Sequence, residues 1–324
     1  METLEGTELC FPQLFNNSCR KTKRPHFEAM LIYILVSSIS PLTVTLNLLV
    51  IISISHFKQL HTSTNLLLLS LAVSDFFVGL HMFFQITATD DCWFLGDLMC
   101  VLYQYIAYII TSASVGNMVL ISIDRYVAIC DPLHYSTKVT QKRVKICVCL
   151  CWTGSIVLQS LNHKDTLKQP GRHNSCSGEC ILGITDIAGL TDLILTFIAP
   201  ITVIVVLYMR VFVVAVSQAR AMRSQVTAVT FVTAKKSEIK AARALGVVVV
   251  VFLICLCPYY CVALTSQDNL MNTSSATIVI SLIYVNSCLN PIIYAFFYPW
   301  FRKSVRFIVI LKILQPDSCD ANIL

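Results

Sequence analysis

Three acidic residues of this sequence lie in segments that are otherwise apolar. Asp75 lies in LLLLSLAVSDFF, Asp124 follows VLISI, and Asp192 lies in GLTDLILTFIAP. A carboxylate in apolar surroundings is costly unless it is hydrogen-bonded, paired with a cation or solvated. Their type and setting therefore indicate the binding of cations or polar groups.

Asp192 is the first candidate for a ligand site. It precedes Pro200 by eight residues, about two helical turns, in a segment without Lys or Arg. An unpaired carboxylate at that depth favours a cation delivered from outside, which would be a ligand. Asp186, six residues earlier, could assist at the entrance. The alternative is that Asp192 faces a water-filled crevice and is simply hydrated.

Aromatic rings can complete a cation site, and each contributes about 0.5–2 kcal/mol. Singly, each tyrosine is also explained by core packing or by a belt at the membrane interface. Together they favour a cation site, with Thr111 among them against the organic part of the ligand. The candidates are Tyr103, Tyr108, Tyr259, Tyr260 and Tyr284.

Asp75 has Asn47 and Asn290-Pro291 as expected polar partners on other apolar segments. Such a cluster holds water or a cation, for which sodium is the candidate, between helices. The alternative is a purely structural hydrogen-bond network.

Asp124 is followed by Arg125 and Tyr126, and Glu238 is a second candidate partner for Arg125. An ion pair between two helices makes a two-state latch, because outward movement of one helix breaks it. The alternative is a surface ion pair without a switching role.

The sequence carries no pattern typical of catalysis. It has no metal-ligand spacing, no glycine-rich phosphate loop and no nucleophile–base arrangement, and Cys255-Leu256-Cys257 lies in a helical context. We therefore expect a protein that is not an enzyme and needs no cofactor.

The elements that position these residues follow from composition. Of the 324 residues, 56% are hydrophobic and 13% are charged, against about a quarter charged in soluble domains. A spanning helix needs roughly 20 mostly apolar residues. We predict an all-α membrane protein, a bundle of seven transmembrane helices, with spans near 29–55, 65–87, 98–122, 144–161, 187–214, 241–264 and 275–297.

Charge predicts the orientation of the bundle. Of 24 Lys and Arg residues, 7 lie on the N-terminal side of the spans and 17 on the other side. The excess marks the cytosolic side and indicates contact with lipid head groups and not nucleic acid. We expect an extracellular N-terminus (1–28), a transmembrane domain (29–297) and a cytoplasmic amphipathic helix and tail (298–324). No internal repeat is visible, which argues against inverted-repeat transporters.

Six of the 15 cysteines lie on the predicted outer side, an even number that favours three disulfides in an oxidising compartment. They are Cys10, Cys19, Cys92, Cys100, Cys176 and Cys180. Glycosylation sequons at Asn16 and Asn272 lie on the same side.

Residues on several of the predicted spans match one known pattern. They are Asn47, SLAVSD ending at Asp75, Cys100, Asp124-Arg125-Tyr126, Trp152, Pro200, Tyr208, Pro258 and Asn290-Pro291-Ile292-Ile293-Tyr294. With these residues the chain resembles a rhodopsin-like (class A) G-protein-coupled receptor over essentially all of its length. Residues 286–301 of span seven are similar, moreover, to the fingerprint of the trace amine-associated receptors.

The resemblance implies a disulfide between Cys100 and Cys180. It further suggests Cys10–Cys176 and Cys19–Cys92, two pairs that could exchange partners. It also implies that Tyr208, Asn290, Pro291 and Tyr294 take part in activation together with Asp124, Arg125 and Tyr126.

Departures from the family pattern are informative. Amine receptors generally place an aspartate seven residues after the cysteine that opens span three, and Ala107 stands there in this chain. Many fish members of the family carry an acid where Asp192 lies, so the resemblance points to a fish olfactory receptor that binds its amine from span five. Leu256 replaces the usual tryptophan before Pro258, which implies activation through packing around Phe252.

From the residues and the resemblance together, we expect a plasma-membrane receptor for a small amine. We expect it to signal through a stimulatory heterotrimeric G protein and to lie in the cilia of olfactory sensory neurons. The alternatives are the same fold with a neutral or lipid ligand, and a transporter or channel with an ion site at Asp75.

Overall fold

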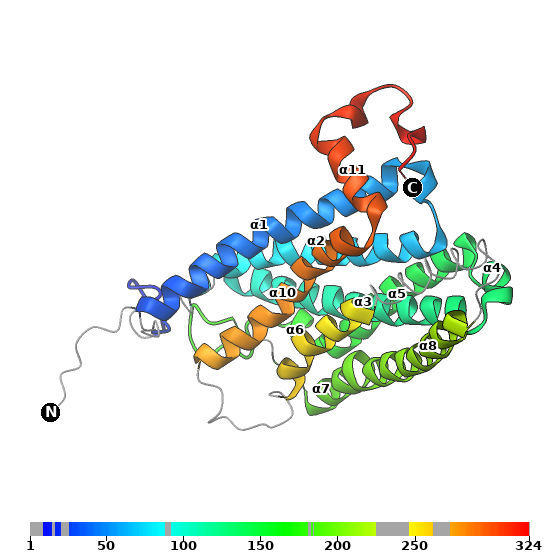
Figure 1. The fold of residues 1–324 in the computed structure, drawn as a ribbon. Coiled ribbons are helices and arrows are strands. Elements are labelled where there is room, and N and C mark those ends of the chain that lie inside the picture. Colours follow the sequence, from blue (N-terminus) through cyan, green and yellow to red (C-terminus); the bar gives the residue numbers. More distant parts are fainter. Residues whose placement is uncertain are drawn as a thin grey trace.

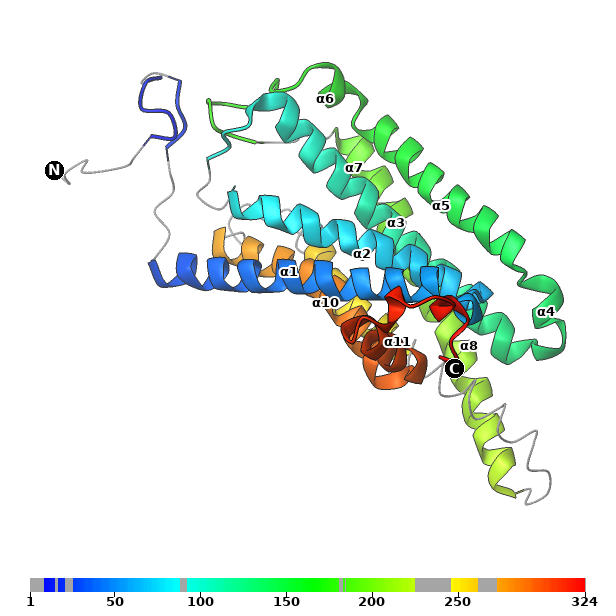
Figure 2. The ribbon, with the colours of Figure 1, turned by 90° about the horizontal axis from the view of Figure 1, so that it is seen from above.

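The fold is a bundle of long helices, seen in a computed structural model that describes residues 9–14, 17–20, 26–87, 92–180, 183, 185–224, 246–261 and 273–323. Its long helices are α1 (His26–His56), α2 (Ser63–Thr87), α3 (Gly96–Cys130), α5 (Gln141–Asn162), α7 (Asp186–Asp192) continuing through η3 (Leu193–Ile198) into α8 (Ala199–Ser224), the unlabelled helix Gly246–Cys261, and α10 (Thr273–Phe297). Figures 1 and 2 show α1 between α2 and α11 (Pro299–Val309), with α10 beside α2.

Five of the described helices are long and apolar enough to cross a membrane. Two shorter apolar helices, Gly246–Cys261 and Ser281–Phe297, supply the remaining segments of the predicted seven-helix bundle. Helices that are apolar around their whole circumference form where lipid replaces water. The predicted fold class, an all-α bundle of seven membrane-spanning helices, is therefore confirmed.

Short elements join the long helices and follow them. They are η1 (Lys58–Leu60), η2 (Pro132–His134), α4 (Tyr135–Lys138), α6 (Lys164–Lys168), η4 (Lys312–Leu314) and η5 (Ser318–Asp320). The helix α11 buries Trp300, Phe301 and Ser304 and turns its Arg and Lys residues outward. An amphipathic helix therefore follows the last span.

The helix around Asp192 is irregular. The turn η3 is π-helical, and the N–H of Ala199 bonds to the carbonyl of Ile194, five residues earlier. Pro200 lacks an N–H and its ring crowds the carbonyl four residues before it, which widens the preceding turn. The wide turn begins directly after Asp192 and so sets the direction of that side chain.

The three disulfides gather at one end of the bundle, which we call the disulfide end. Cys100 pairs with Cys180, the pairing that the resemblance implies. The other two suggested pairs are wrong: Cys10 pairs with Cys92, and Cys19 with Cys176.

Backbone pairing explains this exchange of partners. The N–H of Cys19 bonds to the carbonyl of Ser177 at 2.9 Å, which lays Cys19 beside Cys176. The N–H of Trp93 bonds to the carbonyl of Gly178 at 2.7 Å, and Gly178 lies against the Cys10 side chain, which brings Cys92 to Cys10. A disulfide needs its two Cα atoms within about 7 Å, so these strand-like contacts select the partners.

The opposite end of the bundle, which we call the α11 end, holds the C-terminal residues. Figure 1 shows the chain returning to the end of α1. Lys58 Nζ pairs with the Asp320 carboxylate at 2.9 Å, and His56 Nε2 lies 3.0 Å from Ser318 Oγ. Ile323 is fully buried there. The tail therefore packs on the α1–α2 connection.

Candidate ligand-binding site

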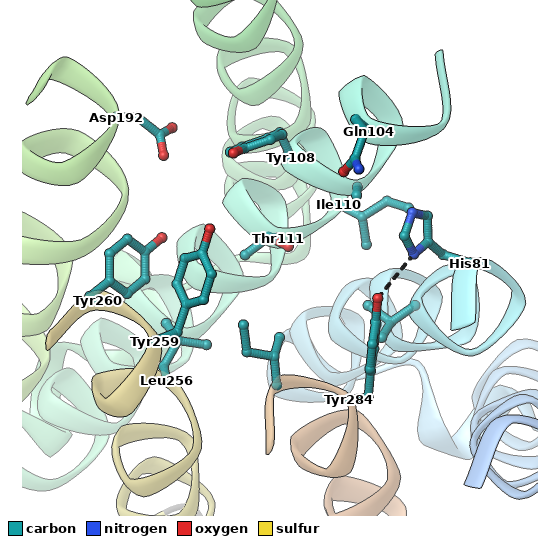
Figure 3. A pocket seen from close by; sticks show the side chains of 13 residues that line it. His81, Gln104, Tyr108, Ile110, Thr111, Asp192, Leu256, Tyr259, Tyr260 and Tyr284 are labelled. Carbon is teal, nitrogen blue, oxygen red and sulfur yellow. Dashed lines mark hydrogen bonds between the residues drawn. The ribbon is translucent and has the colours of Figure 1, made fainter. Parts of the chain in front are cut away.

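A cavity of about 200 Å³ lies between the helices (Figure 3). Its lining residues on α3, from Gln104 to Thr111, follow Cys100 of the disulfide end. Side chains from α2, α3, α7, the helix Gly246–Cys261 and α10 line the cavity. A cavity of about 150 Å³ holds one benzene molecule, so this one suits a small ligand. Six residues predicted for ligand binding line it: Tyr108, Thr111, Asp192, Tyr259, Tyr260 and Tyr284.

Asp192 lies at one end of the cavity, on the last turn of α7. Gln159 of α5 donates from Nε2 to Oδ1 of the carboxylate at 2.7 Å. The hydroxyl of Thr196 donates to the main-chain carbonyl of Asp192 at 2.6 Å and so braces the wide turn. The side chain is half-buried, and Figure 3 shows the carboxylate pointing toward Tyr108 and Tyr260. The Gln159 amide therefore orients this acid while the acid still faces the cavity.

Three tyrosines surround the carboxylate, and each is held by its neighbours. Tyr260 stacks on Phe197 with ring centroids 4.0 Å apart, and Tyr259 meets Tyr260 edge-on at 5.2 Å. The ring of Tyr108 packs against His163 at 4.7 Å. Packed rings lose little additional freedom when a ligand arrives, so this end of the cavity is preorganised for a cation beside an acid.

Asp75 lies deeper in the bundle and is fully buried. Its two carboxylate oxygens accept hydrogen bonds from Ser287 Oγ at 2.7 Å and Asn290 Nδ2 at 2.8 Å. Asn47, expected to contact Asp75, instead donates to the carbonyls of Thr43 and Ser287, both at 3.0 Å. Asn47 is therefore linked to Asp75 only indirectly, because Ser287 of α10 bonds to both residues. Sequence reasoning did not identify Ser287 as the direct partner.

Asp124 and Arg125 form a buried pair toward the α11 end. Arg125 Nε donates to Asp124 Oδ2 at 2.9 Å, and Nη2 donates to Thr64 Oγ1 at 2.7 Å. Tyr135 donates to Asp124 Oδ1 at 2.8 Å. The predicted partner Glu238 lies outside the described residues. In this conformation the arginine is therefore bound to its neighbouring acid and to α2.

The profile of the family "7 transmembrane receptor (rhodopsin family)" matches residues 46–294. Trace amine-associated receptor 13c of Danio rerio is 36% identical over 98% of this chain and 97% of its own length. Trace amine-associated receptor 1 of Macaca mulatta is 35% identical over 94% and 95%, and trace amine-associated receptor 4 of Mus musculus 32% identical over 98% and 95%.

The chain belongs to the trace amine-associated receptors of the rhodopsin family. It is a receptor and not an enzyme, as expected. Membership makes it a multi-pass protein of the plasma membrane with a ligand on one side and a heterotrimeric G protein as partner.

Two residues expected in the receptor's ligand site do not line the cavity. Tyr103 stacks on His81 with centroids 3.9 Å apart and stands behind it. Asp186 is exposed in the first turn of α7, where the Thr185 side chain caps the helix. Six residues separate Asp186 from Asp192, which is more than one and a half turns, so the two acids face different sides of the helix.

The receptor's remaining predicted switch residues lie along the inside of the bundle. Phe252 and Tyr294 are almost fully buried, and the Tyr126 ring packs beside Ile129 and Val211. The hydroxyls of Tyr208 and Tyr294 are buried without a hydrogen-bond partner among the described residues. The glycosylation sites Asn16 and Asn272 lie outside the described residues.

Sequence reasoning missed several residues of the cavity and its surroundings. His81 and Gln104 line the cavity, and Gln159, outside the lining, donates a hydrogen bond to Asp192. His81 carried a usable signal, because an ionisable residue within an apolar span is functional by default. Gln159 carried none, since its role depends on which face of α5 meets α7.

Proposed function

We propose that this receptor detects a small amine whose ammonium group pairs with Asp192. The observation that carries the proposal is that Asp192 is the single acid among the described residues lining the cavity. Ala107 lines the same cavity where amine receptors usually place their aspartate, and its methyl group cannot pair with an ammonium. The cation therefore binds at the fifth span.

The surroundings of Asp192 support a cation and not an additional anion. The rings of Tyr108, Tyr259 and Tyr260 present electron-rich faces and hydroxyl oxygens near the carboxylate. A desolvated cation over such rings gains about 2 kcal/mol from each favourable contact. The organic part of the amine packs toward Thr111 and Tyr284. The small cavity volume favours a ligand of only a few more atoms than benzene.

Signalling requires that the amine binds the active conformation more tightly than the inactive one. We propose that outward movement of the Gly246–Cys261 helix frees Arg125 for a stimulatory G protein at the α11 end. The packing of Phe252 and Leu256, both almost fully buried, links that helix to the cavity, because Leu256 lines it. Glu238 as a second partner of Arg125 belongs to the same proposal, as do the activation roles of Asn290, Pro291 and Tyr208.

Location and modification complete the proposal. The disulfide end is extracellular, with glycans at Asn16 and Asn272, and the receptor serves olfaction in sensory cilia. A sodium ion or water near Asp75 is supported by two buried acceptors, Asn47 Oδ1 and Asn290 Oδ1, which have no partner among the described residues.

The test is the cAMP response of cells that express Asp192→Ala or Asp192→Asn, challenged with short primary amines. Loss of one member of a buried ion pair costs about 2–5 kcal/mol, so we expect potency to fall at least about 30-fold. Asp186→Ala is the matched control, because this exposed acid lies on the same helix outside the cavity, and it should respond like the unmodified receptor.

A neutral ligand is the second candidate function, and one observation favours it. Gln159 already donates to the Asp192 carboxylate, so the acid has a partner without any ligand. Full amine potency in Asp192→Ala, with the receptor present at the cell surface, would contradict the ammonium site and favour this candidate.

A further inference from the structure

The end of the cavity opposite Asp192 is polar but carries no acid among the residues described there. Figure 3 shows His81 of α2 and Tyr284 of α10 at that end, with Gln104 of α3 above them. All three side chains can form hydrogen bonds. The two ends of the cavity therefore differ in chemistry, with a carboxylate at one end and uncharged polar groups at the other.

His81 is held in a fixed orientation. Its ring stacks on Tyr103, with centroids 3.9 Å apart and planes within 14°. Trp93, which follows Cys92 of the Cys10–Cys92 disulfide, packs against Tyr103 with ring centroids 5.4 Å apart. The second contact of the ring is from Nδ1 to the hydroxyl of Tyr284 at 3.5 Å. The ring is therefore preorganised and needs no ligand to order it.

The other ring nitrogen of His81 is the unusual atom. Nε2 is buried and has no hydrogen-bond partner among the described residues. Buried polar atoms of side chains are paired in the great majority of cases, and each exception calls for an explanation. A ligand atom in the cavity would supply the missing partner.

The missing partner is an uncharged group. A second ammonium at this end would be buried without a counter-ion, because the one acid among the described lining residues lies at the opposite end. A hydroxyl, in contrast, can donate or accept and so matches His81 in either neutral tautomer. The geometry selects a hydroxyl over an amine.

We infer that His81 determines specificity by binding a hydroxyl at the far end of the ligand, so that the preferred class is a short primary amino alcohol and diamines are disfavoured. This inference rests on the proposed function, in which Asp192 holds the ammonium. The small cavity volume limits the spacer between the two groups to a short chain or a single ring.

The experiment compares three ligand series of three to seven carbons: n-alkylamines, ω-amino alcohols and α,ω-diamines. The cAMP potency of each is measured on the unmodified receptor and on His81→Phe, which keeps the stack on Tyr103 but has no ring nitrogen. His81→Gln is the second variant, because it keeps a hydrogen-bonding group. Surface expression of every variant is measured alongside.

We expect the best amino alcohol to be about three- to tenfold more potent than the alkylamine of equal length on the unmodified receptor. His81→Phe should abolish this ratio by lowering the potency of the amino alcohol more than that of the alkylamine, and His81→Gln should restore part of the ratio. Equal potency of the two ligands on the unmodified receptor, a more potent diamine, or an unchanged ratio in His81→Phe would each overturn the inference.

Asp192→Ala separates this inference from the function on which it rests. If Asp192→Ala loses its response to alkylamines and amino alcohols, and the potency ratio of these two ligands is unchanged in His81→Phe, the His81 site is overturned and the ammonium site is kept. Full response in Asp192→Ala, with a lost ratio in His81→Phe, overturns the ammonium site and keeps the hydroxyl site. No response to any ligand by receptor at the cell surface overturns both.

Discussion

Asp75 and Asp192 are both acids within apolar helices, but the protein surrounds them differently. Asp75 is fully buried, and Ser287 and Asn290 of α10 donate to its two oxygens. Asp192 is half-buried at a cavity, and Gln159 donates to one of its oxygens. The first acid joins two helices, whereas the second is oriented but still open to a ligand.

The difference shows that depth in the membrane does not by itself identify a ligand site. The cost of a buried carboxylate is offset either by donors from the protein or by a cation from outside. Asp124 follows the first pattern, because Arg125, Thr64 and Tyr135 all contribute to its network. An acid that can still accept further hydrogen bonds is suited to bind a ligand, whereas an acid whose oxygens are already bonded to protein donors has a structural role.

The largest effect that would sharpen this comparison is expected from Asp75→Ala. The change leaves two buried donors on α10 unpaired, and each hydrogen bond to a charged group contributes about 1.5–3 kcal/mol. We expect the maximal cAMP response to fall by roughly fivefold or more for every agonist, with the potency order of the amines unchanged. Ser74→Ala is the control, since its hydroxyl bonds within its own helix to the carbonyl of Leu71. A selective change in amine potency order would break the distinction between the two acids.

A smaller effect is expected from Gln159→Leu, which removes the amide that orients Asp192. The carboxylate that pairs with the ammonium remains, so the loss of this hydrogen bond affects the ligand only indirectly and amine potency should fall about two- to fourfold. Concentration–response curves measure the shift, and Ser155→Ala, one turn away on α5, should have no effect because its hydroxyl bonds to Cys151 of the same helix. A loss as large as that of Asp192→Ala would mean that Gln159 itself contacts the ligand.

The smallest effect is expected from Tyr135→Phe in the α3–α5 connection. Burial and the nearby Asp124 carboxylate raise the pKa of Tyr135, so its hydroxyl stays protonated and donates throughout the physiological pH range. Losing one of several donors to Asp124 should raise basal cAMP about twofold, because the arginine is held less firmly. Thr137→Ala, exposed in the same connection, is the control. Lower basal activity in Tyr135→Phe would contradict a restraining role for this network.

Much of the cavity could be predicted from residue type and depth alone. Asp192 and four of the five tyrosines were recognised because polar and aromatic side chains in apolar spans are few and costly to bury. The same reasoning was wrong for Tyr103, because the position of a residue along a helix does not determine whether its side chain faces the cavity or a neighbouring ring. The same limit hid His81, which faces the cavity, and Ser287, which stands between Asn47 and Asp75.

The sequence by itself determined the seven apolar helices, the amphipathic helix after the last of them and the family. Each of these depends on composition and on residues close together in the chain, which local hydrophobicity and helical spacing specify. Only the tertiary structure decided the partners of Cys10 and Cys19, the amide that orients Asp192 and the ring nitrogen of His81 that is left without a partner among the described residues. These join residues far apart in sequence, from Gln159 to Asp192 or Cys10 to Cys92, because the rotation of each helix about its axis and the register of paired backbone segments are set by packing and not by local pattern.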